Sequence, residues 1–134
     1  AYNAIPSVVY TNPEIACIGL TEKDLNDIKE GDFAPSMSTD KPFVPYEVHK
    51  LPMTFSGRFV AENEGETGLC KVIVDQRNKT IIGVHMIGNP CSEFVAAASF
   101  AVRMGYTVAE FKQVVFPHPT TGEVLREVIC EALS

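Results

Sequence analysis

Alternating apolar and polar positions predict most of the strands in this chain. The clearest pair spans 69–75 and 80–87, where a polar turn joins two runs rich in β-branched residues, so a β-hairpin is expected. His85 lies among the aliphatic residues of the second run, where a histidine is more often a core or sheet-face residue than a ligand. Four other stretches have a strand-like composition between turn residues: 5–11, 14–20, 32–38 and 46–52. The turn Asn12-Pro13 separates the first two, which are expected to pair.

Apolar residues at helical spacing predict a long helix over 91–104, and Gly105 marks its end. The helix is apolar around much of its circumference, which indicates burial on more than one side, by the sheet or by a partner. Shorter helices are predicted at 21–28, 107–111 and 123–133. The last has an apolar stripe formed by Val124, Leu125, Val128, Ile129 and Leu133. Residues 51–58 have no strong period. Strands grouped before helices predict an α+β domain, with helices packed on an antiparallel sheet.

Length and composition indicate one folded domain over residues 1–134. Apolar residues make up 46 % of the chain and charged residues 21 %, as in an ordinary globular domain. The net charge of −6 comes without a basic cluster, which argues against general nucleic-acid binding. No apolar run approaches a membrane span, and the separate cysteines lack the Cys-x-x-Cys spacing of a zinc or redox site. This usage is typical of a reduced, intracellular chain.

The stretch Phe116–Glu127 holds the strongest candidate for chemistry. A proline on each side of His118 restricts the backbone, so this histidine is expected on a stiff turn outside the helix that follows. Thr120 to Glu123 fit a capping box, with Thr120 as the N-cap and Glu123 reaching back. The spacing places an imidazole near a carboxylate, which can orient the ring and raise its basicity as a general base requires. The spacing alone favours a plainer reading, in which Glu123 only caps the helix, because capping boxes are far commoner than catalytic pairs.

Two further readings stay open on the residues alone. In one, the domain is a structural or binding module without chemistry. In the other, His118 works with Cys91 or Cys130 in a small hydrolase, although no nucleophile elbow or oxyanion glycine pattern accompanies either cysteine. The acidic turn 62–68 lacks the alternating oxygen ligands of a calcium loop and is expected to be a solvated loop, so no metal site is expected.

Motifs spread along the whole chain resemble those of one family. In order they are Ile5-Pro6-Ser7-Val8-Val9-Tyr10-Thr11-Asn12-Pro13-Glu14, Gly19-Leu20-Thr21-Glu22, 68–71, Ile82-Gly83-Val84-His85-Met86-Ile87-Gly88, and His118-Pro119-Thr120 with Glu123. Together they resemble the C-terminal dimerisation (interface) domain of the flavin-dependent pyridine nucleotide-disulfide oxidoreductases, and among these the dihydrolipoamide dehydrogenases. The matching domain covers essentially all of residues 1–134.

The resemblance implies a role for each residue around His118. His118 is expected to be the catalytic acid/base and Glu123 its orienting carboxylate, supplied to the active site of the partner subunit in a homodimer. In the family the histidine takes a proton from a substrate thiol, and the thiolate then attacks a redox disulfide. The backbone at His118 and Pro119 is expected to contact the flavin of the partner. The peptides His118-Pro119 and Asn12-Pro13 are expected to be cis.

Two departures and two absences bear on this assignment. Phe116 stands where the family usually has a first histidine, and Gly122 stands where serine is frequent. The chain has no Gly-x-Gly-x-x-Gly unit and no close cysteine pair. It is therefore expected to bind no cofactor and to be inactive alone, with FAD and NAD bound by other domains of the parent enzyme. The resemblance further implies a cytoplasmic location, or the mitochondrial matrix in a eukaryote, and a 2-oxo acid dehydrogenase complex as a partner. Glutathione reductase is the alternative relative with the same His-Pro-Thr stretch.

Overall fold

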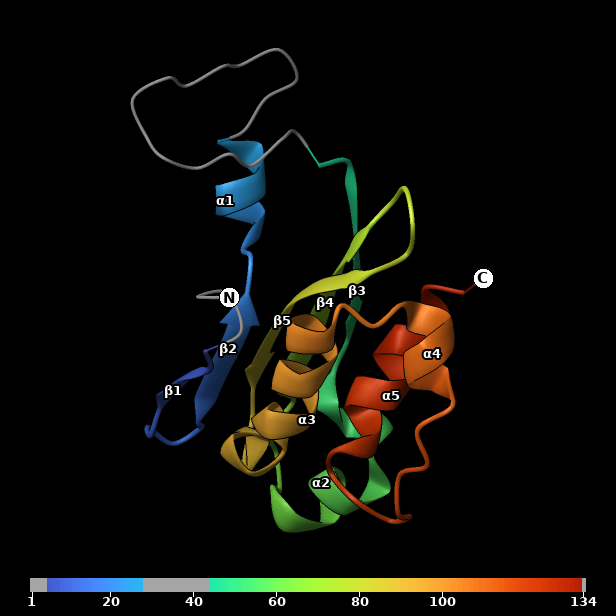
Figure 1. Cartoon of the computed structure of the whole chain (residues 1–134). Coiled ribbons are helices and arrows are strands. Elements are labelled where there is room, and N and C mark those ends of the chain that lie inside the picture. Colours follow the sequence, from blue (N-terminus) through green and yellow to red (C-terminus); the bar gives the residue numbers. More distant parts are fainter. Residues whose placement is uncertain (1–4, 28–43, 134) are drawn as a thin grey trace.

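Five antiparallel strands form one sheet in the computed structural model, which describes residues 5–27 and 44–133. The strands follow the order β1-β2-β5-β4-β3 across the sheet (Figure 1). Their bounds are β1 (Ser7–Val9), β2 (Ile15–Gly19), β3 (Tyr46–Leu51), β4 (Leu69–Asp75) and β5 (Ile81–Ile87). Both predicted hairpins are confirmed, since β1 pairs with β2 and β4 with β5. The candidate strand 32–38 lies outside the described residues, and 46–52 is confirmed as β3.

Three helices cover one face of this sheet, as Figure 1 shows. The helix α3 (Cys91–Met104) packs on β2 and β5, and α5 (Glu123–Glu131) packs on β3 and β4. The short α4 (Val108–Lys112) lies against α5. A further short helix, α1 (Glu22–Asn26), follows β2 at the far end of the sheet. The predicted α+β architecture, with helices on an antiparallel sheet, is therefore confirmed.

The core lies between the sheet and these helices. Alternate strand residues point into it, so that Val72 and Val84 face each other across β4 and β5 with no exposed surface. Burying a valine, leucine or isoleucine fully contributes about 1.5–3 kcal/mol, so this row is a main source of stability. The alternate positions on the opposite sheet face include Ile15 and Ile87, which pair with each other and remain partly exposed.

Helix ends follow the local sequence. Thr21 caps α1 through a full capping box with Asp24, and the Thr107 hydroxyl accepts a hydrogen bond from the Glu110 amide at the start of α4. Gly105 ends α3 with a φ of 65°, a left-handed conformation that costs glycine little. These signals depend on residues three or four positions apart, so they could be predicted. Residue 28, the predicted end of the first helix, lies outside the described residues.

The structure differs from the prediction in two short elements and in the exposure of Leu133. A 3₁₀ turn, η2 (Met53–Phe55), leads into α2 (Gly57–Glu62), where the sequence shows no clear period. The helix is too short for a periodic pattern, and its place is fixed by Phe59, which is fully buried. Leu133 was predicted to extend the apolar stripe of the last helix, but it follows α5 and is 44 % exposed. The stripe ends there because the helix does.

Candidate functional site

The segment 113–122 connects α4 to α5 and carries the histidine singled out from the sequence. In Figure 1 it descends along the molecule and turns at the end where α2 lies. The peptides His118-Pro119 and Asn12-Pro13 are cis, as expected, and a third cis peptide joins Asn89 to Pro90. Prolines restrict the backbone on both sides of His118, so its side chain projects from a turn with little local freedom.

His118 and Glu123 contact each other directly. The imidazole Nδ1 lies 2.9 Å from Glu123 Oε1 and 2.8 Å from Oε2. The side chain of His118 is 82 % exposed, whereas that of Glu123 is 22 % exposed. With Nδ1 directed at the carboxylate, Nε2 is the ring nitrogen available to exchange a proton with a group outside the domain. The pair thus consists of a supported carboxylate and an imidazole presented at the surface.

The start of α5 differs from the predicted capping box in one half. Glu123 does reach back, and its Oε1 accepts a hydrogen bond from the Thr120 amide at 2.6 Å. Thr120 is not the N-cap, because the helix begins after Gly122 and the Thr120 hydroxyl donates instead to the Pro117 carbonyl at 2.8 Å. The hydroxyl therefore tightens the turn around His118, while the carboxylate serves both the turn and the histidine.

Electrostatics keep Glu123 ionised. Burial would raise the pKa of this carboxyl group, but hydrogen bonds from His118 and from the Thr120 amide outweigh it, so the pKa lies below its ordinary value of 4.5. The carboxylate behind Nδ1 fixes the orientation of the ring and leaves Nε2 directed away from Glu123.

A shallow groove of about 390 Å³ opens beside the pair. Its lining combines the exposed Val115, the ring of His118 and the charged side chains of Lys112, Arg126 and Glu127. The groove is open at the surface beside the exposed imidazole.

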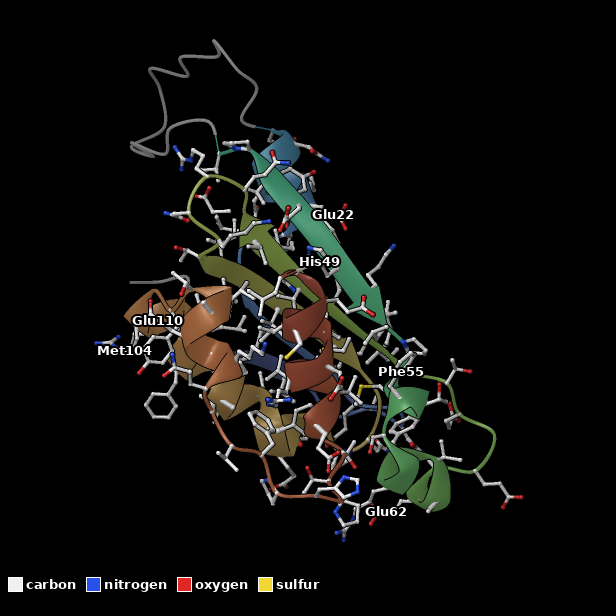
Figure 2. The ribbon with its side chains drawn as sticks, turned by 90° about the vertical axis from the view of Figure 1, so that its right-hand side faces the viewer. Glu22, His49, Phe55, Glu62, Met104 and Glu110 are labelled. Atoms are coloured by element: carbon white, nitrogen blue, oxygen red, sulfur yellow. The ribbon has the colours of Figure 1, made fainter. Side chains whose placement is uncertain are left out.

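Ser56, the N-cap of α2, and Arg58 within this helix also contact the segment, and no sequence pattern predicted either contact. The Ser56 hydroxyl donates to the Thr120 carbonyl at 2.9 Å, and Arg58 Nη1 donates to the Pro119 carbonyl at 3.3 Å. These partners lie about half the chain apart, and no local spacing rule connects such positions. Figure 2 marks Glu62, at the end of the same helix, in this region of the molecule.

The other reactive side chains lie elsewhere. His85 is a half-buried sheet-face residue, as predicted, and its Nε2 lies 2.9 Å from the Leu20 carbonyl. Cys91 is buried, and burial together with the nearby Glu14 carboxylate raises the pKa of its thiol to about 11. A thiol with so high a pKa is a poor nucleophile, which counts against a hydrolase that uses Cys91. Cys130 lies about 10 Å along α5 from Glu123, given a rise of 1.5 Å per residue.

Within residues 5–27 and 44–133, no group of three or more histidine, cysteine, aspartate or glutamate side chains has an arrangement that could hold a metal ion. No helix in this part of the chain is long and apolar enough to cross a membrane.

Comparison with known proteins assigns the chain to a family. The model of the pyridine nucleotide-disulphide oxidoreductase dimerisation domain matches residues 5–129. The mitochondrial dihydrolipoyl dehydrogenase of Caenorhabditis elegans is 36 % identical over 126 residues, which cover 94 % of this chain and 22 % of that protein. The dihydrolipoyl dehydrogenase of Thermus scotoductus is 36 % identical over 129 residues, covering 96 % of this chain and 24 % of that protein.

Solved structures show the same fold. LpdA from Mycobacterium tuberculosis superposes with a TM-score of 0.81 at 21 % identity, over 100 % of this chain and 26 % of that one. The HOCl-induced flavoprotein disulfide reductase RclA from Escherichia coli, as its Cu(II) complex, gives a TM-score of 0.77 at 18 % identity, over 96 % and 26 %. The chain thus spans about a quarter of the length of its relatives. It belongs to the pyridine nucleotide-disulphide oxidoreductase family and is the dimerisation domain of such a protein.

Proposed function

We propose that this domain supplies His118 and Glu123 to the active site of a partner subunit in a dihydrolipoamide dehydrogenase-like flavoenzyme. The observation that carries the proposal is the contact between an imidazole that is 82 % exposed and a carboxylate that is 22 % exposed. A buried structural histidine would keep both ring nitrogens inside the domain, whereas Nε2 of His118 can reach a group outside it. The similarity to dihydrolipoyl dehydrogenases favours a dihydrolipoamide-like dithiol as the substrate.

The chemistry of the chain's own residues is proton transfer. Nε2 of His118 takes the proton of a substrate thiol, and Nδ1–H donates to Glu123, whose charge stabilises the imidazolium. The thiolate that forms is the nucleophile for disulfide exchange, since the thiol itself is unreactive. Its attack on a redox disulfide breaks the S–S bond and gives a mixed disulfide and a second thiolate. The imidazolium is then available to return the proton.

FAD and NAD are proposed to be held by other domains of the parent enzyme. A dinucleotide-binding unit needs parallel strands joined by a helix, whereas every strand pair described here is antiparallel. The residues present therefore do not fit either nucleotide as a group resident in this domain. His118 and Pro119 are exposed residues, and their backbone is proposed to face the flavin of the partner subunit.

Glu123→Gln is expected to lower the kcat of dihydrolipoamide oxidation by about 10²-fold, since general acid–base catalysis contributes roughly 10²–10⁴-fold. KM should change little, because the groove keeps its shape. Wild-type Glu123 also stabilises the folded state: this contribution is full above the ordinary pKa of 4.5 and is lost as the pH falls through the lowered folded-state pKa. Steady-state kinetics and urea unfolding at several pH values measure both effects.

A matched control is Glu66→Gln, which removes the same charge from the exposed loop before β4. This variant should keep wild-type kcat and acid stability. Normal turnover in Glu123→Gln, with only its acid stability altered, would support the alternative function of a non-catalytic dimerisation module, in which the carboxylate holds the turn and nothing more.

Dimerisation is proposed to involve the outer face of α3. Phe100 and Met104 are one turn apart on this helix and are 66 % and 61 % exposed; Figure 2 marks Met104 at the surface. Large apolar side chains at such positions are typical of a protein interface. Phe100→Asp is therefore expected to weaken the dimer roughly tenfold or more in sedimentation equilibrium.

Val9→Asp provides the comparison for this dimer prediction. Val9 pairs with Ile15 at the edge of the sheet, is 49 % exposed, and lies away from α3. If Val9→Asp dissociates the dimer while Phe100→Asp leaves it intact, α3 is the wrong surface.

A cytoplasmic or mitochondrial-matrix location and association with a 2-oxo acid dehydrogenase complex complete the proposal, on the strength of the dihydrolipoyl dehydrogenase relatives.

A further inference from the structure

The turn around His118 is held in place from outside by α2. Within the segment itself, the Thr120 hydroxyl bonds to the Pro117 carbonyl and the Thr120 amide bonds to Glu123. These bonds shape the turn but do not fix its position relative to the sheet. Hydrogen bonds from Ser56 and Arg58 link the turn to the start of α2, while Phe116 packs against the core and Thr121 is buried.

Ser56 is the stronger of these two anchors. It is 3 % exposed, and its hydroxyl accepts a hydrogen bond from the Phe59 amide at 3.2 Å while donating to the Thr120 carbonyl at 2.9 Å. A hydroxyl has one proton to donate, and here that proton goes to the turn. Thr120 is thereby bound on both sides, since its amide reaches Glu123 and its carbonyl reaches Ser56.

Packing gives the turn less support on this side. A mostly apolar groove of about 410 Å³ separates it from α2 and from the start of α3, and is lined by Glu62, Phe94 and Phe116 among others. Arg58 spans the groove edge to the Pro119 carbonyl, but its side chain is 52 % exposed and also pairs with Glu62. The buried hydroxyl is therefore the main fixed link between α2 and the turn.

The base of this link is rigid. Phe59 and Met53, which flank Ser56 in sequence, are both fully buried in the core. The chain of contacts runs from the core through Ser56 to Thr120, then through the carboxylate of Glu123 to Nδ1 of His118. The bonds from Ser56 to Thr120, from Thr120 to Glu123 and from Glu123 to His118 are 2.9, 2.6 and 2.9 Å long.

We propose that Ser56 is a positioning residue for His118, fixing the Thr120 backbone and so the direction of the imidazole. This inference rests on the proposed function, in which His118 exchanges a proton at Nε2. Ser56→Ala should lower the kcat of the full-length flavoenzyme about tenfold with KM unchanged, because small displacements of a catalytic group cost that much or more. Ser56→Thr keeps the hydroxyl and should restore most of the lost activity.

Because Ser56 also caps α2, the effect of removing this cap must be distinguished from the effect of removing the contact with Thr120. Thr21→Ala is the matched control: it removes the cap of α1, which is remote from the turn. Both alanine variants should lower the melting temperature, Ser56→Ala by more because it also loses the bond to the Thr120 carbonyl, while only Ser56→Ala should lower kcat. Equal kcat values in the two variants would overturn the proposal.

A second measurement does not depend on turnover. In proton NMR of the chain, the carbon-bound ring protons of His118, which do not exchange with water, report the contact of the imidazole with Glu123; Ser56→Ala should shift or broaden their signal while Ser56→Thr retains it. An unchanged signal in Ser56→Ala would overturn the positioning role. If His118→Gln proves fully active, the proposed function fails, and this spectrum still decides whether Ser56 positions the ring.

Discussion

Replacing His118 by glutamine in the full-length flavoenzyme is expected to lower dihydrolipoamide oxidation by about 10²–10⁴-fold, the range over which a positioned acid or base acts. Glutamine can still bond to Glu123 but cannot take up a proton, so the thiolate is formed only by solvent. Flavin content and the melting temperature should stay close to wild type, because the His118 side chain is 82 % exposed. Stopped-flow measurement of flavin reduction by the dithiol checks the step directly.

The control is His85→Gln, on the sheet away from the turn, where the side chain lies beside the Leu20 carbonyl. The His85→Gln enzyme should turn over normally.

Action across subunits can be tested by mixing His118→Gln subunits with subunits whose redox disulfide has been disabled. If His118 serves the partner, the mixed dimer regains one of its two sites, since each site draws its cysteines and its histidine from different subunits. No recovery on mixing, given that heterodimers form, would place the histidine in its own subunit's site.

Phe59→Ala is expected to destabilise the domain by about 3–5 kcal/mol, the usual cost of truncating a buried phenylalanine. The ring is fully buried on α2 and lies against the backbone of Gly88, where an added methyl carbon would come within 3.0 Å of it. Its loss leaves a cavity beneath α2 and loosens the helix that carries Ser56. Urea unfolding followed by circular dichroism measures the change in the free energy of unfolding.

Val60→Ala is the matched variant for this measurement. Val60 is the next residue of the same helix and is 50 % exposed, so its truncation should cost less than about 1 kcal/mol. Similar decreases in the free energy of unfolding of the two variants would mean that helix propensity, and not the burial of Phe59 in the core, holds α2 in place.

Local patterns in the sequence predicted much of the fold. The hairpin of β4 and β5, the long helix ended by Gly105 and the caps at Thr21 and Thr107 all depend on residues within a few positions of one another. The spacing also placed His118 near Glu123, but by itself it favoured a capping role alone for the carboxylate, and the structure shows contacts of Glu123 both with the Thr120 amide and with His118. The wrong N-cap at Thr120 shows the limit of such rules: its hydroxyl had two local partners available, and the packing of the turn selected the Pro117 carbonyl.

The sequence by itself determined the α+β class, most of the elements and the proximity of His118 to Glu123, because periodicity, caps and short spacings act over one or two turns of chain. Only the tertiary structure decided where α2 lies, because that short helix has no period and is placed by burying Phe59. It also decided which groups support the turn at His118, since Ser56 and Thr120 meet only when the core brings distant segments together. A hydrogen bond between residues so far apart in the chain cannot be predicted from local sequence patterns.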